Sequence, residues 1–428
     1  MNARPELSTV RAMDDCLVNL PLLDPADARE IILHDVEEIR GNETSPLGSL
    51  VGRVAAADVT SAVCLPRFDN SAVDGFGLHA ADLQKHAPLM LSIVGRVAAG
   101  HDTSTKLEPG KTFRILTGAR IPDGVSAVIL EERATRSVAD VTLHFVPEMG
   151  ANIRGRGEDV SSGTIIVPRG TVLDARHLAI LAASGNARIS VKRRLRVGVL
   201  STGDELVEPA VKTAPSAIID TNRPMLLALL GSPAIDVVDL GIIADDRAGI
   251  ARTLREAASH LDLLITSGGV AGSDADHLEP AILAAGGRCR TLKLALRPGK
   301  PIGKGVVDNM QVLALPGNPV AALVNFLLFG RPLVQTLLGA MDGSPHAPIA
   351  RVAGMFGHRA GRTEFVPIRV ERFGADGLPI VSKLGRGGSA RLLPLVMSDG
   401  FAEIGPEVGD LGDGAIVRFH PFSTGFAL

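Results

Sequence analysis

The amino-acid sequence predicts a multidomain α/β protein. We expect a central α/β catalytic domain with a parallel sheet, an inserted β domain, a helical or extended linking domain and a C-terminal β-barrel domain. Three observations carry this prediction. The 428 residues exceed one ordinary domain. Apolar strands alternate with helical stretches between about 195 and 340. Short β-branched runs, separated by Gly and Pro, lie on both sides of that region.

The linking domain is predicted from two helical segments that flank a stretch of short strands. "DPADAREIILHDVEEIR" is expected to be a helix with Asp24 as its N-cap, followed by Pro25 in the first turn. "TVLDARHLAILAASG" is expected to be a second helix, with Asp174 as N-cap and Gly185 as its stop. We expect both pieces to pack together as one discontinuous domain. Its predicted ranges are 1–67 and 161–192.

Two β domains are predicted from short runs of β-branched residues. The inserted domain, 68–160, contains "PLMLSIVGRV", "KTFRILTG", "SAVILEE" and "VTLHFV". The terminal domain, 343–428, contains "RVAGMF", "EFVPIRVER", "LPIVSKL" and "AIVRFH", which we interpret as a barrel.

The catalytic domain, 193–342, alternates strands with helices. The predicted strands are "LRVGVLST", "VVDLGII", "LDLLITSGG", "TLKLAL" and "VLALPG". Between them lie helical stretches, including "NRPMLLALL", where Asn222 is expected to act as the cap. This alternation predicts a parallel sheet covered on both faces.

Composition excludes several classes of protein. The absence of Trp and Tyr removes most stacking platforms for nucleic acid, and a net charge of -3 offers no basic footprint. Three scattered cysteines form neither a zinc pattern nor a disulfide framework. The first 20 residues contain no secretory signal, and the apolar stretch 320–330 is too short to span a bilayer. We therefore expect a cytoplasmic protein that binds neither nucleic acid nor membrane.

The stretch "LDLLITSGGVAGSDADH" indicates a ligand site at one edge of the predicted sheet. In an open parallel sheet, ligands bind beyond the carboxyl ends of the strands. Gly268 and Gly269 allow the backbone to approach a ligand closely, and free N–H groups at a helix start attract phosphate. Asp274 and Asp276 follow directly.

Charged residues follow the other strands at the same edge. Cations are expected from Arg297, Lys300 and Lys304, with Lys293 on the preceding strand. The acids at this edge are Asp204, Glu205, Asp245, Asp246, Asp274 and Asp276. Such acids would repel one another without a cation, and Mg²⁺ prefers hard oxygen ligands. Acids at a helix start also serve as caps, but five loops on one edge favour an oxyanion cradle beside a metal site.

An ordered series of motifs resembles one family. The motifs are "FDNSAVDGFG", "RILTGARIPDG", "RGEDVSSG", "LSTGDEL", "SGGVAGSDAD", "RPGKP" and "LPGNPVAAL". From about residue 20 onward, the chain is similar to the molybdopterin molybdenumtransferases, relatives of the C-terminal domain of gephyrin. The resemblance implies an elongated four-domain homodimer whose α/β domain is molybdopterin-binding-like. It also implies Mg²⁺ as cofactor, with adenylylated molybdopterin and molybdate as substrates and AMP as a product.

The pattern at the sheet edge and the resemblance together assign roles to residues of this chain. Catalytic roles fall on Asp74, Thr117, Asp159, Glu205, Asp246 and Asp276. Cofactor or anion binding falls on Ser267, Gly268, Gly269, Lys293, Arg297, Lys300, Pro301, Arg362 and Ser389. Metal binding falls on Asp246, Asp274 and Asp276. Arg362 suits this role because its guanidinium offers paired donors to an oxyanion. Other cofactor-assembly proteins and acceptor molybdoenzymes are implied partners.

Two other functions remain open at this stage. A molybdopterin or nucleotide adenylyltransferase, or a pyrophosphatase, could use the same α/β domain, although the flanking segments 20–190 and 345–428 would then be superfluous. A non-catalytic, gephyrin-like scaffold is the third hypothesis. Ala271 and Phe76, which depart from the family pattern, keep it open.

Overall fold

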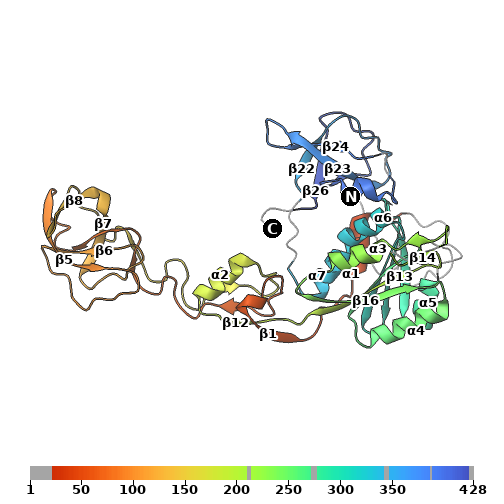
Figure 1. Cartoon of the computed structure of the whole chain (residues 1–428), viewed down its shortest axis with the longest axis horizontal. Helices are drawn as coiled ribbons and strands as arrows, with labels where there is room; N and C mark the ends of the chain where they lie inside the picture. The colour runs from red at the N-terminus through yellow and green to blue at the C-terminus, as the bar shows by residue number, and fades with distance from the viewer. Residues whose placement is uncertain (1–21, 210–213, 271–276, 342–346, 386–387, 424–428) are drawn as a thin grey trace, which may run out of the picture. The chain divides into compact units, whose positions relative to one another are not determined.

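The computed structural model describes residues 22–209, 214–270, 277–341, 347–385 and 388–423 (Figure 1). Contacts divide the chain into two units. Unit 1 comprises Met1–Gly41 and Lys192–Leu428, and unit 2 comprises Asn42–Val191. The four narrower domain ranges given above stay a prediction.

Unit 1 contains the expected α/β domain. Its six-stranded sheet has the order β16-β13-β17-β21-β20-β18. The strands are β13 (Leu195–Thr202), β16 (Ile235–Ile243), β17 (Leu263–Ser267), β18 (Arg288–Lys293), β20 (Pro301–Val307) and β21 (Met310–Leu315). β16, β13, β17 and β21 are parallel neighbours, and every residue of β17 is buried. These buried apolar runs are typical of a sheet covered on both faces.

Helices cover the two faces of this sheet. α4 (Arg247–Ala258) and α5 (Leu278–Ala284) form one apolar core with the sheet, in which Leu254 and Ile282 pack with Leu264. α3 (Asn222–Leu229), α6 (Pro319–Asn325) and α7 (Arg331–Leu337) lie on the other side (Figure 1). The carboxyl ends of the parallel strands therefore remain open between the two helical layers.

Strand β20 differs from the expectation. We predicted a loop after "TLKLAL", but Pro301–Val307 pairs antiparallel with both β21 and β18. Its glycines suggested a loop, yet they serve packing, since a Cβ at Gly303 would lie 3.0 Å from the Ala314 Cβ. Because β20 runs the other way, Pro301 lies at the open edge and Lys304 lies within the sheet.

The first helix is shorter than predicted. α1 (Pro25–Leu33) has the expected N-cap, in which the Asp24 carboxylate accepts the Ala26 N–H at 2.8 Å. It ends at Leu33 rather than near residue 40, because Asp35 has a positive φ of 59°. Lys304 donates from Nζ to the carbonyls of Ile31 at 3.1 Å and His34 at 2.7 Å. Lys304 therefore satisfies this helix end instead of contributing a cation to the sheet edge.

Unit 2 contains the other β domain. Its six-stranded sheet has the order β7-β4-β6-β5-β9-β8. The strands are β4 (Gly75–His79), β5 (Leu89–Val97), β6 (Lys111–Ile115), β7 (Val125–Leu130), β8 (Ala134–Arg136) and β9 (Asp140–Leu143). All four runs predicted from the sequence lie in this sheet. β4 was missed; its buried Phe76 packs with Leu91 and Ile129.

The remainder of unit 2 consists of paired short strands around α2 (Ala175–Ala183). β1 (Asn42–Pro46) pairs with β12 (Arg188–Lys192), and β2 (Val59–Thr60) pairs with β11 (Ile165–Val167). A further pair joins β3 (Asn70–Ser71) and β10 (Ile153–Arg154). The predicted cap of α2 is confirmed: Asp174 accepts the N–H groups of Arg176 and His177.

The terminal domain is the predicted barrel. β23 (Thr363–Phe373), β24 (Pro379–Lys383), β22 (Ile349–Val352), β26 (Ile416–Pro421) and β25 (Gly400–Ile404) follow one another around it. Pairing of β25 with β23 closes the ring. The two-residue strand β19 (Leu296–Arg297) belongs to the α/β domain, yet it pairs in parallel with β23. The barrel is therefore tied directly to the sheet edge.

The apolar stretch near residue 320 forms a longer helix than expected. α6 continues through the π-helical segment η4 (Phe326–Gly330) into α7, so Pro319–Leu337 spans 19 residues. Length and composition alone would allow this helix to cross a membrane, but 72% of its apolar window is buried inside the protein. We interpret it as a core helix.

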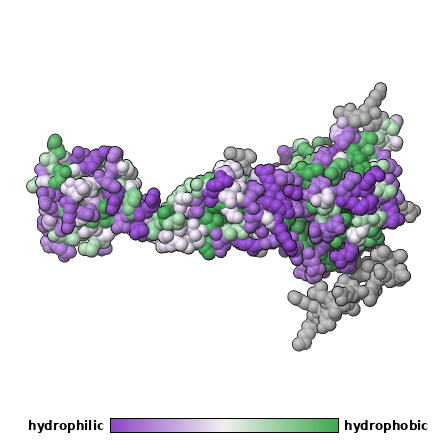
Figure 2. Space-filling model, turned by 90° about the horizontal axis from the view of Figure 1, so that it is seen from below, coloured by the Kyte–Doolittle hydropathy of each residue, from purple (hydrophilic) through white to green (hydrophobic). Residues whose placement is uncertain are grey.

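On the visible face of the molecule, hydrophilic and hydrophobic residues are interspersed (Figure 2).

Replacing Lys304 with Met tests the junction between α1 and β20. The change leaves two carbonyl groups without their donor, and we expect the free energy of unfolding to fall by about 1–2 kcal/mol. Urea denaturation measures the effect. Arg252→Met, at an exposed position of α4, is the control and should change stability by less than about 0.5 kcal/mol. Equal stabilities of the two variants would contradict this role of Lys304.

Candidate functional site

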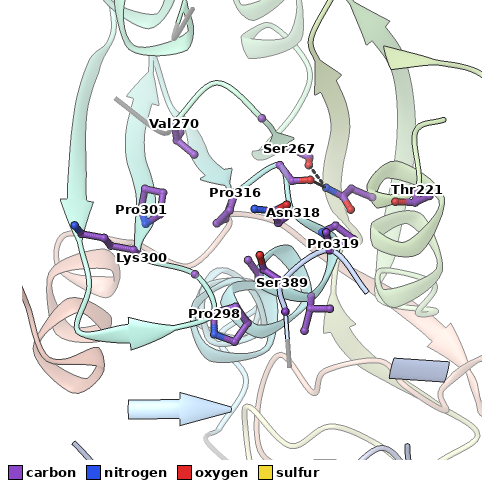
Figure 3. A pocket seen from close by; sticks show the side chains of 18 of the residues that line it. Thr221, Ser267, Val270, Pro298, Lys300, Pro301, Pro316, Asn318, Pro319 and Ser389 are labelled. Atoms are coloured by element: carbon purple, nitrogen blue, oxygen red, sulfur yellow. Dashed lines mark hydrogen bonds between the residues drawn. The ribbon is translucent and has the colours of Figure 1, made fainter. Parts of the chain in front are cut away.

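The carboxyl edge of the α/β sheet opens into a pocket of about 1050 Å³ (Figure 3). Segments that follow β13, β17 and β21 form one side of it, and the 297–301 loop and the barrel form the other. Among the residues predicted from the sequence, the lining includes Glu205, Ser267, Gly268, Gly269, Arg297, Lys300, Pro301, Arg362 and Ser389. The structure thus brings together residues that are up to about 180 positions apart in the sequence.

The backbone conformation and the surroundings of the two glycines after β17 disfavour any residue with a side chain. Gly268 and Gly269 have φ values of 97° and 73°, in the left-handed region. A Cβ at Gly268 would lie 2.5 Å from the Thr202 carbonyl oxygen. The side-chain oxygen of Thr202, which is buried, has no hydrogen-bond partner among the residues that the structure describes. A polar atom that lacks a partner beside a bare backbone is a favourable position for a ligand.

The loop at 297–301 is held at both of its ends. β19 places Arg297 next to Glu364 of the barrel, and the Leu294 N–H donates to the Lys300 carbonyl at 2.7 Å. Gly299 has a φ of 111°, and a Cβ there would lie 2.0 Å from Asn325 Nδ2. This close approach positions the loop so that Lys300 lies at the edge of the pocket (Figure 3).

The barrel supplies a second group of pocket residues. The Val320 N–H, at the start of α6, donates to the Ser389 carbonyl at 3.0 Å, so the two domains share a backbone bond beside the pocket. Arg362 and Lys383 also line the pocket. Among the described residues, no carboxylate pairs with Lys300, Arg362 or Lys383. The basic side of the pocket therefore has positive charge available to an anion.

The acidic side of the pocket is formed by Glu205 and Asp245. Burial raises the pKa of Asp245, and the charges of Asp204 and Glu205 raise it further. The Asp245 N–H donates to Asp204 Oδ1 at 3.0 Å, which keeps these acids close together. Carboxylates that repel one another in this way would be stabilised by a cation.

Two predicted residues of the α/β domain lie outside the pocket lining. Asp246 is the N-cap of α4, and its two carboxylate oxygens accept the N–H groups of Ala248 and Gly249 at 3.1 and 2.9 Å. Lys293 is at the end of β18, where its carbonyl accepts the Leu23 N–H at 2.8 Å. The acid that lines the pocket at this position of the chain is Asp245, the neighbour of Asp246.

Three other predicted residues belong to unit 2. Asp74 Oδ1 accepts hydrogen bonds from both the hydroxyl and the backbone N–H of Thr117, at 2.6 and 2.7 Å. The hydroxyl bond is the main reason that the pKa of Asp74 lies below its usual value. Asp159 lies in a turn, with its N–H donating to the Leu65 carbonyl at 3.1 Å. All three are exposed and therefore accessible to a ligand.

The predicted metal ligands Asp274 and Asp276 lie outside the described residues, as does Ala271. Within the ranges that the structure describes, no three His, Cys, Asp or Glu side chains are arranged to hold a metal ion. The metal site therefore stays a prediction.

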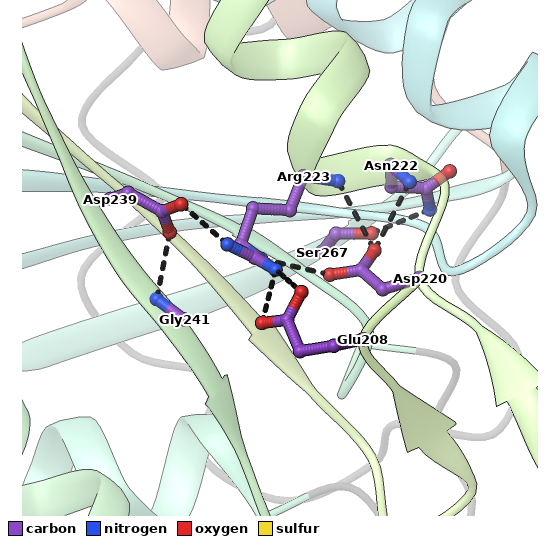
Figure 4. A network of polar contacts seen from close by, with 7 residues as sticks. All are labelled: Glu208, Asp220, Asn222, Arg223, Asp239, Gly241 and Ser267. Carbon is purple, nitrogen blue, oxygen red and sulfur yellow. Dashed lines mark hydrogen bonds and ion pairs between the residues drawn. The ribbon is translucent and has the colours of Figure 1, made fainter. Parts of the chain in front are cut away.

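A polar network that reaches from the pocket lining to the buried Arg223 was not predicted from the sequence (Figure 4). Asn222 was expected to cap α3, but the helix starts at Asn222 and the N-cap position is Thr221. The carboxylate of Asp220, one position earlier, accepts the N–H groups of Asn222 and Arg223. Asn222 Nδ2 instead donates to Ser267 Oγ at 2.7 Å and to the Gly317 carbonyl at 2.8 Å. It thereby joins the loops that follow β17 and β21.

Arg223 holds this network in place. Its guanidinium pairs with Asp220, Glu208 and Asp239, and its side chain is 7% exposed. Burial lowers the pKa of Arg223, but the bonds to Asp239, Asp220 and Glu208 outweigh burial and raise the pKa overall. The pattern "TNRP" gave no signal for this role, because Glu208 and Asp239 lie on other elements.

Comparison with known families covers most of the chain. Residues 23–185 match the MoeA N-terminal region (domain I and II). Residues 198–336 match a probable molybdopterin binding domain, and residues 350–422 match the MoeA C-terminal region (domain IV).

Individual relatives agree with these matches. The molybdopterin molybdenumtransferase of Haemophilus influenzae is 35% identical over 398 residues, which cover 92% of this chain and 98% of the relative. Molybdopterin molybdenumtransferase 2 of Mycobacterium tuberculosis is 35% identical over 328 residues, covering 74% of this chain and 81% of the relative. The crystal structure of the molybdopterin biosynthesis moeA protein from Pyrococcus horikoshii OT3 superposes with a TM-score of 0.79. Its identity is 27%, and the match covers 94% of this chain and 100% of that structure.

Replacing Arg223 with Met tests the buried network. Three carboxylates then lose their common partner, but Glu208 and Asp239 are about half exposed and can take up water. We therefore expect a loss of about 2–3 kcal/mol in the free energy of unfolding, below the range for a fully buried pair. Arg194→Met is the matched control, because its pair with Asp236 is exposed on both sides; its loss should stay below about 1 kcal/mol. Equal losses would show that Arg223 has no special structural role.

Proposed function

The chain belongs to the molybdopterin molybdenumtransferase family, and we propose that it inserts molybdate into adenylylated molybdopterin with release of AMP. The relatives that are named as this transferase match the chain over most of their own length. Their similarity includes the segments outside the α/β domain, which a minimal adenylyltransferase or pyrophosphatase would not need. The adenylylating and scaffold alternatives are therefore not favoured.

One observation carries the proposal: unpaired cations from two domains line a single pocket with the bare backbone of a double glycine. Lys300 comes from the α/β domain and Arg362 from the barrel. Within the described part of the chain, neither side chain has a carboxylate partner. An oxyanion such as molybdate would satisfy both charges, with Arg362 offering paired donors.

The chemistry assigns separate tasks to the two sides of the pocket. Hydrolysis adds water across the phosphoanhydride bond, so that one phosphate leaves as AMP and the other stays on the pterin. On the basic side, Lys300, Arg362 and Ser389 hold molybdate near the dithiolene sulfurs. Both thiols bind the molybdenum as one molybdate oxygen leaves with their two protons as water. On the acidic side, Glu205 orients water or the leaving phosphate.

A divalent metal, which we propose to be Mg²⁺, fits the acidic side. Burial and the charges of Asp204 and Glu205 raise the pKa of Asp245. Together these three carboxylates are oxygen donors of the kind that a hard cation prefers. We propose that Glu205 and Asp245 join Asp274 and Asp276 as ligands. Asp246 stays a prediction as a ligand, because its oxygens already accept helix N–H groups. Bound metal would supply Lewis-acid stabilisation of phosphate charge.

We also propose a cytoplasmic homodimer. The exposed Asp74, Thr117 and Asp159 of unit 2 are residues to which the family resemblance gives a catalytic role. A second copy of the chain would use them to complete the pocket of its partner. Transfer of the finished cofactor then requires acceptor molybdoenzymes and other assembly proteins as partners. The four-domain division drawn from the sequence is part of this proposal.

A single-turnover assay with adenylylated molybdopterin tests the function. We expect AMP release that depends on both molybdate and Mg²⁺. Lys300→Ala should slow it at least tenfold, because it removes one of the cations that hold the oxyanion. Asp276→Ala should also slow it, through loss of a metal ligand. Arg252→Ala, on the exposed face of α4, is the control. Full-rate AMP release by both site variants would contradict the site, and ATP-driven adenylylation of free molybdopterin would favour the adenylyltransferase.

Asp245→Asn tests the metal side by its effect on stability. Since the pKa of Asp245 is raised in the folded protein, folding binds protons, and stability falls as pH rises above the usual carboxyl range. Without divalent metal, the variant should therefore melt about 1–2 °C higher than wild type at neutral pH. This gain should vanish in acid, where Asp245 is protonated in both states.

Mg²⁺ provides the second half of the same measurement. It should raise the melting temperature of the wild-type protein more than that of Asp245→Asn, because the variant has lost a ligand. An equal rise in both proteins would remove Asp245 from the proposed ligand set.

A further inference from the structure

His358, which lies in the barrel outside the pocket lining, has an unusual set of neighbours. Its side chain is only 1% exposed. Nδ1 lies 2.8 Å from the Val408 carbonyl oxygen, and Nε2 lies 3.1 Å from the Arg362 carbonyl oxygen. Both ring nitrogens therefore face groups that can only accept a hydrogen bond.

This arrangement constrains the ring chemically. A neutral imidazole has one N–H donor and one lone pair, so one nitrogen would direct its lone pair at a carbonyl oxygen. The imidazolium form donates at both positions and satisfies both carbonyls. The ring is therefore fixed between these two carbonyl groups, and each contact can be tested separately.

A buried carboxylate lies beside the same ring. Glu364 Oε2 is 3.8 Å from His358 Nε2, its side chain is 8% exposed, and this oxygen has no hydrogen-bond partner. A buried carboxylate needs a compensating charge. Its other oxygen, Oε1, lies 3.6 Å from Arg297 Nε, on the wall of the pocket. His358, Glu364 and Arg297 thus form a row of polar side chains that leads from the barrel interior to the pocket.

The remaining charged groups around His358 leave this row intact. Asp410 accepts the His358 backbone N–H at 2.8 Å through Oδ1, so its hydrogen bond goes to the backbone. The neighbouring Arg359 and Glu407 are exposed to solvent. Arg362 contributes its carbonyl to the ring, while its side chain belongs to the pocket lining.

We infer that His358 is a positioning residue for the anion-binding wall of the pocket, acting through the Arg362 backbone and through the Glu364 carboxylate that faces Arg297. The inference rests on the proposed function, since it takes these two arginines as ligands of molybdate. His358 itself does not touch the substrate. It determines how two pocket cations are held.

Two substitutions separate the contacts of the ring. His358→Gln retains an amide nitrogen near the position of Nε2, toward Arg362, whereas His358→Asn retains one near the position of Nδ1, toward Val408. Molybdate alone is the probe, titrated by calorimetry into the full-length protein. We expect His358→Asn to weaken molybdate binding about tenfold and His358→Gln about threefold, in line with the loss of one charge-assisted hydrogen bond. AMP release at saturating molybdate should change less than twofold in both.

The separation of molybdate affinity from turnover supplies a readout that a purely structural role would not give. A general loss of structure would lower the rate of AMP release at saturating molybdate together with the affinity. His260→Gln, at an exposed position after α4, is the control and should bind molybdate as wild type does.

The outcomes separate this inference from the function on which it rests. Equal molybdate affinities in wild type and both variants would overturn the inference alone. Wild-type protein that binds no molybdate would remove the proposed function and the inference together. Should the His358 variants fail to fold, as judged by circular dichroism, Glu364→Gln decides, because it keeps the size of the side chain that links His358 to Arg297. Weaker molybdate binding than in wild type supports the inference, and unchanged affinity overturns it.

Discussion

The pairing of β19 with β23 is the constraint on which the pocket depends. Leu296 and Arg297 leave the α/β sheet and pair in parallel with Thr363 and Glu364 at the start of the longest barrel strand. The Thr363 N–H adds a bond of 2.9 Å to the Ala295 carbonyl. Because this backbone ladder joins two domains at the open edge of the sheet, the barrel becomes one wall of the pocket.

This junction also separates the charges of the pocket. The cations come from the loop that carries β19 and from the barrel, while the acids Glu205 and Asp245 follow β13 and β16. Two other acids of the lining, Asp220 and Glu364, already pair with Arg223 and Arg297. Two glycines make the approach of the walls possible, since neither Gly268 nor Gly299 has space for a Cβ. An anion and a cation can therefore be bound in one cavity without competing for the same side chains.

The sequence predicted the elements whose signal is local. Continuous apolar runs indicated the parallel strands, and Asp24 and Asp174 marked helix starts through short-range caps. β20 was missed because Gly303 and Gly305 read as loop residues, although they serve close packing within the sheet. The end of α1 was missed because the positive φ of Asp35 has no clear sequence signal, and because the carbonyls there bind Lys304, some 270 residues away.

The part of the site that follows the parallel strands could be predicted, because the carboxyl ends of parallel strands lie at the same edge of a sheet. Sequence pattern could not distinguish Asp246, which caps a helix, from its neighbour Asp245, which lines the pocket. Nor could it reveal Arg223 and His358, whose partners come from distant strands and loops. Long-range polar contacts of this kind appear only when the folded chain brings them together.

Anomalous X-ray diffraction from crystals soaked in molybdate tests the central claim most directly, because molybdenum can be located by its own absorption edge. The account predicts a molybdenum peak between Lys300 and Arg362, within hydrogen-bond distance of both side chains. A molybdenum peak elsewhere, with this pocket free of it, would contradict the account.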